Sequence, residues 1–278
     1  MVSIYVRKKI ADRAVFVVCV LFTGLAVVPL VSVLVSLIRQ GASGMSWSFF
    51  TNLPKPVGES GGGMANALVG TLELVGLASL LGVPAGVLAG VYLAEFGSGR
   101  LGKVVRFSAD VMTGVPSIVV GIFVYALLVV SMRRFSAIAG ACALAIIMLP
   151  VVTRTTEELV RMVPDSLREA ALALGVPRWR GILKVVLPTA APGIATGVML
   201  AVARVAGETA PLLFTAFNNR FWNEGLGQPI ASLPVQVFTY AVAPYEDWQR
   251  QAWAGALTLV ALVFILNLTA RIVVRHRV

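Results

Sequence analysis

Long runs of apolar residues dominate this chain and limit what it can fold into. A bilayer core is spanned by about 20 apolar residues in helical form. The stretches that approximately meet this length are 14–38, 65–94, 111–131, 136–152, 189–217 and 251–274. Of the 278 residues, 58% are hydrophobic and 13% are charged, whereas about a quarter of a soluble domain is charged. The sequence therefore predicts an all-α, polytopic membrane protein with six transmembrane helices.

Lysines and arginines are unevenly distributed over the segments that join these runs. If the N-terminus is cytoplasmic, inner segments hold sixteen of the 23 basic residues and outer segments hold six, with Arg204 left inside a run. Because basic residues concentrate in cytoplasmic loops, we expect both termini inside. The first apolar run exceeds the ~7–15 residues of a signal-peptide core, so we expect it to remain as an anchor.

These expectations divide the chain into segments. They are an inner tail (1–13), a first transmembrane helix (14–38), an outer loop (39–64), a five-helix core (65–274) that includes an inner hairpin (157–187), and an inner tail (275–278).

Composition also argues against several classes of site. The net charge is +10, but the basic residues lie between apolar runs and not in one patch, so nucleic acid is a poor candidate partner. Cys19 and Cys142 lie within apolar runs, and His276 is the only histidine. We therefore expect no disulfide, metal or histidine-based catalytic site. No Gly-rich phosphate loop is present, so we expect this chain to bind neither ATP nor another cofactor.

The connecting segments differ in character. The outer segments 39–64 and 218–250 are long and rich in aromatic residues, which fits either an interfacial belt or a surface for an outer partner. Residues 95–110 are short and mixed in charge, as in a solvated connector. Pro116, inside the third run, predicts a bend, because proline removes a backbone donor.

The inner hairpin is too polar to span the membrane. Ser166 and Glu169 have the spacing of a capping box at the start of a helix. Gly175 is a natural residue to end that helix, and Pro177 suits the start of a second short helix that ends at Pro188. The first helix carries one apolar face, formed by Leu167, Ala170, Ala171 and Leu174. This face suits either a lipid surface or a cleft in another protein, and its alanines favour the cleft.

The hairpin resembles a known motif. Glu169-Ala170-Ala171, then Gly175, then Val185-Val186-Leu187-Pro188 is similar to the EAA motif of ATP-binding-cassette (ABC) importer permeases, with Val185 in place of the usual isoleucine. Further stretches resemble one family of these, the PstA-type phosphate permeases. They are Leu149–Glu157, Val163–Ala171, Ala203–Ala216, Pro116–Gly121 and Gln228–Pro234. The resemblance covers roughly residues 60 to 260.

The resemblance implies a fold, a function and partners. The fold would be that of a type I (MetI-like) ABC importer permease, and the function that of the permease subunit of an ATP-driven phosphate importer. Its partners would be a second, PstC-type permease, a dimer of PstB-type ATPase subunits that bind ATP and Mg²⁺, an outer PstS-type phosphate-binding protein, and the lipids of a prokaryotic cytoplasmic (inner) membrane. The residues implied in coupling to the ATPase are Glu169, Ala170, Ala171 and Gly175.

The fifth run carries charge where charge is costly. Gly193, Gly197 and Ala201 form a stripe of small residues that permits close helix packing. Arg204 follows near the expected midplane, where an arginine costs at least ~2.5–3.5 kcal/mol, so we expect it to face the bundle interior. Glu208 is one turn further on.

Two interpretations of this pair stay open. Arg204 and Glu208 either neutralise each other within the helix, or Arg204 presents a forked donor to a passing phosphate. We assign Arg204 and Glu208 to the substrate path, together with Thr209 and Ser117 from the family-like stretches.

Other functions fit less well. An ion-coupled transporter would also place charges in the membrane, but the chain shows no convincing internal repeat. A membrane enzyme would need a nucleophile with a base, or a metal cluster. A sibling ABC permease for another oxyanion or an amino acid is the nearest alternative.

Overall fold

The computed structural model describes residues 4–59 and 61–275, and these residues form helices without any strand. The elements are α1 (Ile4–Gly44), α2 (Trp47–Thr51), α3 (Ala65–Glu95), α4 (Arg100–Gly114), α5 (Ser117–Val124), the π-helix η1 (Tyr125–Val129), α6 (Val130–Met132), α7 (Ala137–Arg161), α8 (Asp165–Ala173), α9 (Arg178–Gly181), the π-helix η2 (Ile182–Val186), α10 (Leu187–Ala206), α11 (Ala210–Thr215), α12 (Leu233–Ala241) and α13 (Glu246–Arg275). Five stretches of the described residues are long and apolar enough to cross a membrane, or six if one bent pair counts as a span.

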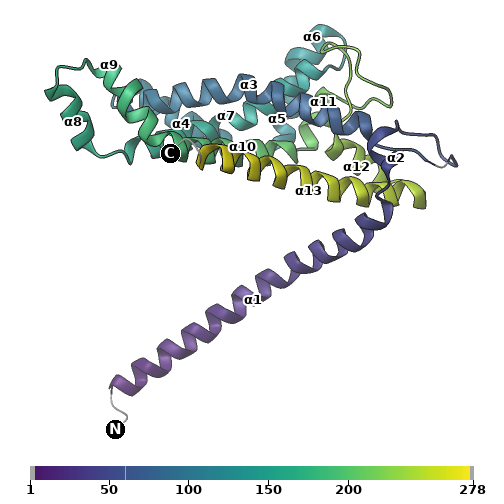
Figure 1. The fold of residues 1–278 in the computed structure, drawn as a ribbon, viewed down its shortest axis with the longest axis horizontal. Helices are drawn as coiled ribbons and strands as arrows, with labels where there is room; N and C mark the ends of the chain where they lie inside the picture. The colour runs from purple at the N-terminus through teal and green to yellow at the C-terminus, as the bar shows by residue number, and fades with distance from the viewer. Residues whose placement is uncertain (1–3, 60, 276–278) are drawn as a thin grey trace.

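The most buried of the long helices, α7, lies at the centre of the bundle (Figure 1). Glycines bring α3 and α10 against it. A Cβ atom at Gly90 of α3 would lie 2.6 Å from the carbonyl oxygen of Thr153, and one at Gly193 of α10 would lie 2.8 Å from Leu159. A Cβ atom at Gly197 would overlap Thr155. The predicted small-residue stripe of the fifth run is thus confirmed as a close contact, and its partner is α7.

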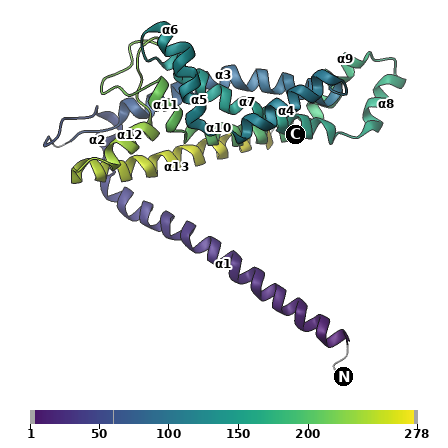
Figure 2. The same ribbon diagram turned by 180° about the vertical axis from the view of Figure 1, so that it is seen from behind.

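The first apolar run lies within α1, which diverges from the bundle (Figures 1 and 2). Helix α1 reaches beyond the predicted limits of 14–38, and it meets α13 through its last turns, where Gly41 abuts Leu257 and Gly44 abuts Arg250. The most apolar part of α1 is exposed on every side. Such a surface requires hydrocarbon or another membrane chain around it.

The third predicted span, 111–131, is not one helix. The chain bends by 106° between α4 and the stretch Ser117–Met132. Pro116 stands at the bend, as predicted, because it has no N–H to donate. The prediction of a solvated connector over 95–110 is wrong, since most of this segment belongs to α4, which packs on α7.

The predicted bounds of the fifth span, 189–217, differ from the observed helix at both ends. A continuous helical stretch runs from Arg178 to Ala206, so the second hairpin helix does not end at Pro188 but continues through η2 into α10. The helix stops at Gly207, and α11 begins three residues later. Pro211 explains the stop, because its ring would collide with the carbonyl of Gly207 in a continuous helix.

Regular structure extends into the other predicted connections. Helix α7 continues past the predicted limit of 152 to Arg161, so the hairpin proper starts at Asp165 and not at Glu157. The outer segments contain α2 and α12. Ser46 caps α2 by accepting the Phe49 N–H at 3.2 Å, and Tyr240 of α12 stacks on Trp248 with ring centres 4.5 Å apart. Hairpin helices α8 and α9 lie at one end of the bundle, and α2, α11 and α12 lie toward the other (Figure 1).

Candidate functional site

A cavity of about 260 Å³ lies where α4, α5, α7 and α10 meet. Its lining is mainly apolar, with polar groups from Thr113, Ser117 and Arg204. Ser117 is the first residue of α5, so the N-terminal end of that helix borders the cavity. Helix N-termini carry partial positive charge. The cavity therefore combines a guanidinium, a helix N-terminus and a hydroxyl, a set that favours an anion.

The structure corrects the predicted setting of Arg204. Its side chain is 52% exposed, so it does not face a closed bundle interior but the open side of the cavity. Glu208 does not share its helix, because α10 ends at Ala206. The Nε atom of Arg204 lies 4.0 Å from Oε1 of Glu208, at the limit of an ion pair.

Of the other two predicted path residues, Ser117 begins α5 and Thr209 lies just before α11, and these two helices are in contact. A Cβ atom at Gly121 of α5 would lie 2.6 Å from the Cα atom of Pro211 in α11, so the two helices touch closely. Thr209 immediately precedes α11 and does not line the cavity. Of the four predicted residues, the structure places Ser117 and Arg204 on one cavity, with Glu208 adjoining Arg204.

We define the hairpin as residues 165–181. Its first helix ends just before Gly175, as predicted. Gly175 has φ +72°, and its N–H donates to Leu172 O at 2.9 Å while that of Val176 donates to Ala171 O at 3.1 Å. This pair of bonds is a Schellman motif. The predicted capping box does not form, because α8 begins at Asp165 with Pro164 before it and no side chain caps it.

The predicted apolar face of α8 is largely uncovered. Ala171 is buried, whereas Ala170 and Glu169 are exposed, and Leu174 is 83% exposed. Trp179 of α9 is exposed as well. A tip of large apolar side chains without cover is typical of a surface that another chain contacts.

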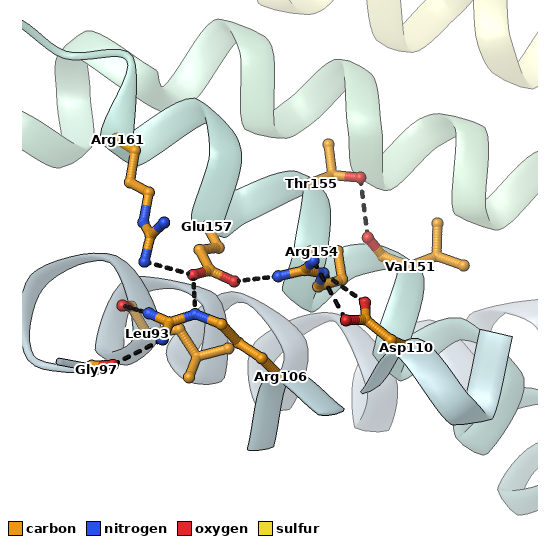
Figure 3. Close-up of polar contacts among 9 residues, drawn as sticks. All are labelled: Leu93, Gly97, Arg106, Asp110, Val151, Arg154, Thr155, Glu157 and Arg161. Carbon is orange, nitrogen blue, oxygen red and sulfur yellow. Dashed lines mark hydrogen bonds and ion pairs between the residues drawn. The ribbon is translucent and has the colours of Figure 1, made fainter. Parts of the chain in front are cut away.

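Sequence reasoning missed a charge cluster next to the hairpin (Figure 3). The Glu157 side chain is 1% exposed, and its carboxylate contacts Arg106 at 2.5 Å, Arg154 at 2.8 Å and Arg161 at 2.9 Å. Arg154 also pairs with Asp110 of α4 at 2.9 Å. The cluster joins α4 to α7. Arginines three residues before and four after Glu157 were a local signal for it.

A carboxylate within the second span was also missed. Glu73 of α3 accepts a hydrogen bond from the Asn223 side chain, which reaches it from the outer segment 218–250 at 3.0 Å. A single acid in an apolar run is a recognisable signal, because charge inside a membrane usually has a partner.

Known proteins of one family resemble this chain over most of its length. The sequence profile of the family described as "Binding-protein-dependent transport system inner membrane component" matches residues 82–277. The phosphate transport system permease protein PstA of Yersinia pestis is 48% identical over 245 residues, which are 88% of this chain and 83% of that protein. PstA 1 of Mycobacterium tuberculosis is 44% identical, over 76% of this chain and 70% of its own. The chain belongs to the PstA family.

Solved structures support the fold of this PstA-family chain. A subunit of the MetNI methionine ABC transporter aligns with a TM-score of 0.59 at 20% identity, over 76% of this chain and 92% of its own. A chain of a bacterial ABC transporter that imports alginate aligns with a TM-score of 0.66 at 16% identity, over 98% of this chain and 99% of its own. The predicted MetI-like ABC permease fold is therefore confirmed.

Proposed function

We propose that this chain is the permease subunit of an ATP-driven importer of inorganic phosphate in a prokaryotic cytoplasmic membrane. The observation that carries the proposal is the anion-favouring cavity at Arg204 in a chain of the PstA family. The open side of the cavity suits a path of which this chain forms half. A second, PstC-type permease completes it.

Arg204 supplies the main attraction for the anion. Its guanidinium is always charged and matches two phosphate oxygens with two parallel donors. Glu208 contacts it only at 4.0 Å, so phosphate can compete for the donors. The N-terminal end of α5 adds a second, backbone-derived attraction at Ser117.

Glu208 contributes selectivity. Near neutral pH inorganic phosphate carries at least one proton, because it has one more ionisable oxygen than a phosphate ester, which loses its last proton with a second pKa of about 6. A carboxylate accepts a hydrogen bond from that P–OH, whereas sulfate carries no proton and meets only repulsion. Glu208 thus favours phosphate over sulfate while it restrains Arg204 when the path is empty.

The hairpin transmits the work of ATP hydrolysis. Its exposed tip enters a cleft of a PstB-type ATPase dimer, which holds ATP and Mg²⁺, and an outer PstS-type protein delivers phosphate. This chain itself binds no cofactor. The continuous helical stretch from Arg178 to Ala206 then links the hairpin directly to Arg204.

Reconstituted complexes in lipid vesicles test the proposal. We expect the complex with the unaltered chain to accumulate phosphate with ATP, and Arg204→Gln to abolish uptake while the complex still assembles. Arg204→Lys keeps the positive charge but lacks the two parallel guanidinium donors, so this variant should retain reduced uptake. Glu208→Gln should lower the preference for phosphate over sulfate. Normal uptake by Arg204→Gln would make Arg204 a structural residue, and ATPase stimulation by sulfate or an amino acid alone would identify a sibling importer.

A further inference from the structure

Three arginines converge on the last turn of α3. Arg106 of α4 donates to the carbonyl oxygens of Leu93 and Gly97, both at 2.7 Å. Arg178 of α9 donates to the carbonyl oxygen of Glu95 and lies over the Phe96 ring, 4.8 Å from its centre. Cations at a helix C-terminus are favourable, because they face its partial negative charge. The third arginine, Arg168 of α8, binds the Glu95 side chain.

Glu95 connects α3 to both arms of the hairpin. Its side chain is 5% exposed, and Oε1 accepts from Nε of Arg168 at 3.1 Å and from Nη2 at 2.9 Å. Nη2 of Arg178 lies 3.8 Å from Oε2. Arg168 also donates to the carbonyl oxygens of Val160 at 2.8 Å and Val163 at 2.5 Å, at the end of α7. One carboxylate and one guanidinium thus join α3, α7, α8 and α9.

Apolar packing at this junction involves residues that flank the hairpin, such as Val163 and Val186, which are buried in a cluster that Val91 and Ala94 of α3 pack against. Few of the hairpin's own residues take part. Ala171 is the one buried residue of α8, and a cavity of about 250 Å³ separates the hairpin arms, with Glu95, Arg168 and Arg178 among its lining residues. The position of the hairpin on α3 therefore depends on charged hydrogen bonds, which are roughly twice as strong as neutral ones. Further along α3, Gly86 and Gly90 bring it into contact with α7, which forms one wall of the Arg204 cavity.

We propose that Glu95 is a positioning residue that makes the hairpin, α3 and α7 move as one body. This inference rests on the proposed transport function. Movement of the hairpin by a partner ATPase then reaches the cavity by two routes. One is covalent, through α10 to Arg204 and through residues 162–164 to α7, and the other passes through Glu95 to α3, which packs on α7. Without Glu95, the hairpin moves relative to α3, and α3 no longer keeps α7 in step with α10.

The first test compares two carboxylates that contact Arg168, in complexes reconstituted with the partner subunits. Glu95→Gln keeps the size of the side chain and removes its charge. Asp165→Asn is the control, because Asp165 contacts Arg168 at 3.1 Å but its side chain is 87% exposed. We expect Glu95→Gln to lower phosphate transported per ATP hydrolysed roughly tenfold, as for loss of one charged hydrogen bond, and Asp165→Asn to leave the ratio unchanged. Equal ratios for both variants would overturn the proposal.

A cross-link provides the second test and covers the case of a poorly folded variant. Glu95→Cys and Arg168→Cys are combined in a chain with Cys19→Ser and Cys142→Ser, and a short bis-maleimide joins the new pair. We expect the unlinked variant to hydrolyse ATP with little transport, and the linked one to recover its coupling. Normal coupling without the link, or no recovery of coupling with it, would overturn the proposal. The proposed function is judged separately, by phosphate uptake with the unaltered chain.

Discussion

At the scale of single residues, Glu157 is a position outside the cavity where we expect substitution to destabilise the fold. It is buried among Arg106, Arg154 and Arg161, so its removal takes the carboxylate from Arg106 and Arg161 and leaves Arg154 with Asp110. Removing one partner of a fully buried ion pair costs about 3–5 kcal/mol, and the partial exposure of the three arginines lowers the cost here. We expect Glu157→Ala to lower the thermal unfolding temperature of the purified chain in detergent strongly, and Glu157→Gln to lower it less.

The adjacent acid supplies the matched control. Glu158 is exposed, and its replacement by Gln should change the unfolding temperature little, because exposed charges contribute about 0–1 kcal/mol. If Glu157→Ala and Glu158→Gln melt at the same temperature, the cluster does not stabilise the bundle.

Residues differ in how far the sequence could predict their roles. Arg204 was identifiable because a charge in an apolar run stands out, and Gly175 because a glycine followed by proline ends a helix. Glu95 was not, since its partner Arg168 is 73 positions away and only the fold brings them together. Likewise, Arg106 is 51 positions from Glu157.

At the scale of elements, the turn of the hairpin depends on the left-handed backbone of Gly175. A Cβ atom there would meet no neighbour within 4 Å, so a substitution acts through backbone strain alone. Asparagine tolerates this conformation, whereas a β-branched residue does so at a cost of roughly 1–2 kcal/mol. We expect Gly175→Asn to keep ATP-driven phosphate uptake and Gly175→Val to lose most of it at equal membrane insertion. Equal uptake by the two would argue against a coupling role for this turn.

A second prediction at this scale concerns the contact between α3 and α7. A Cβ atom at Gly90 would overlap Thr153 and Thr156, whereas one at Gly76 of the same helix has nothing within 4 Å. Gly90→Val should therefore push the helices apart and reduce the yield of monodisperse protein in size-exclusion chromatography. Gly76→Val places the same side chain in open space and should not. Similar yields would mean that α3 and α7 separate without penalty.

The apolar runs in the sequence predicted the positions of the long helices but not the points where two of these helices are interrupted. The run 65–94 corresponds to α3 almost residue for residue, because its apolar stretch and its helix end together. The runs 111–131 and 189–217 are interrupted at Pro116 and before Pro211. Both prolines were visible in the sequence, but a hydropathy window averages over them. The breaks matter for function, since they place Ser117 at a helix N-terminus and release Glu208 from the helix of Arg204.

At the scale of the whole molecule, basic residues gather at the end of the bundle that carries the hairpin. Contacts at the ends of α3 and α7, beside α8 and α9, gather Arg106, Arg154, Arg161, Arg168 and Arg178. The start of α1 and the end of α13 lie toward the same side of the molecule as α8 and α9 (Figure 2). Because basic segments stay in the cytoplasm, this arrangement predicts that the hairpin and both termini are cytoplasmic.

Cysteine labelling in intact cells checks this orientation. Cys19 and Cys142 are first replaced by serine, and single cysteines are placed at exposed positions of opposite ends: Gly225→Cys, in the segment 218–250, and Ser98→Cys, between α3 and α4. A Cβ atom at Gly225 meets nothing within 4 Å, so the substitution should not disturb the fold. A membrane-impermeant maleimide should label position 225 in intact cells and position 98 only after permeabilisation. The reverse pattern would invert the orientation, and the hairpin could then not reach a cytoplasmic ATPase.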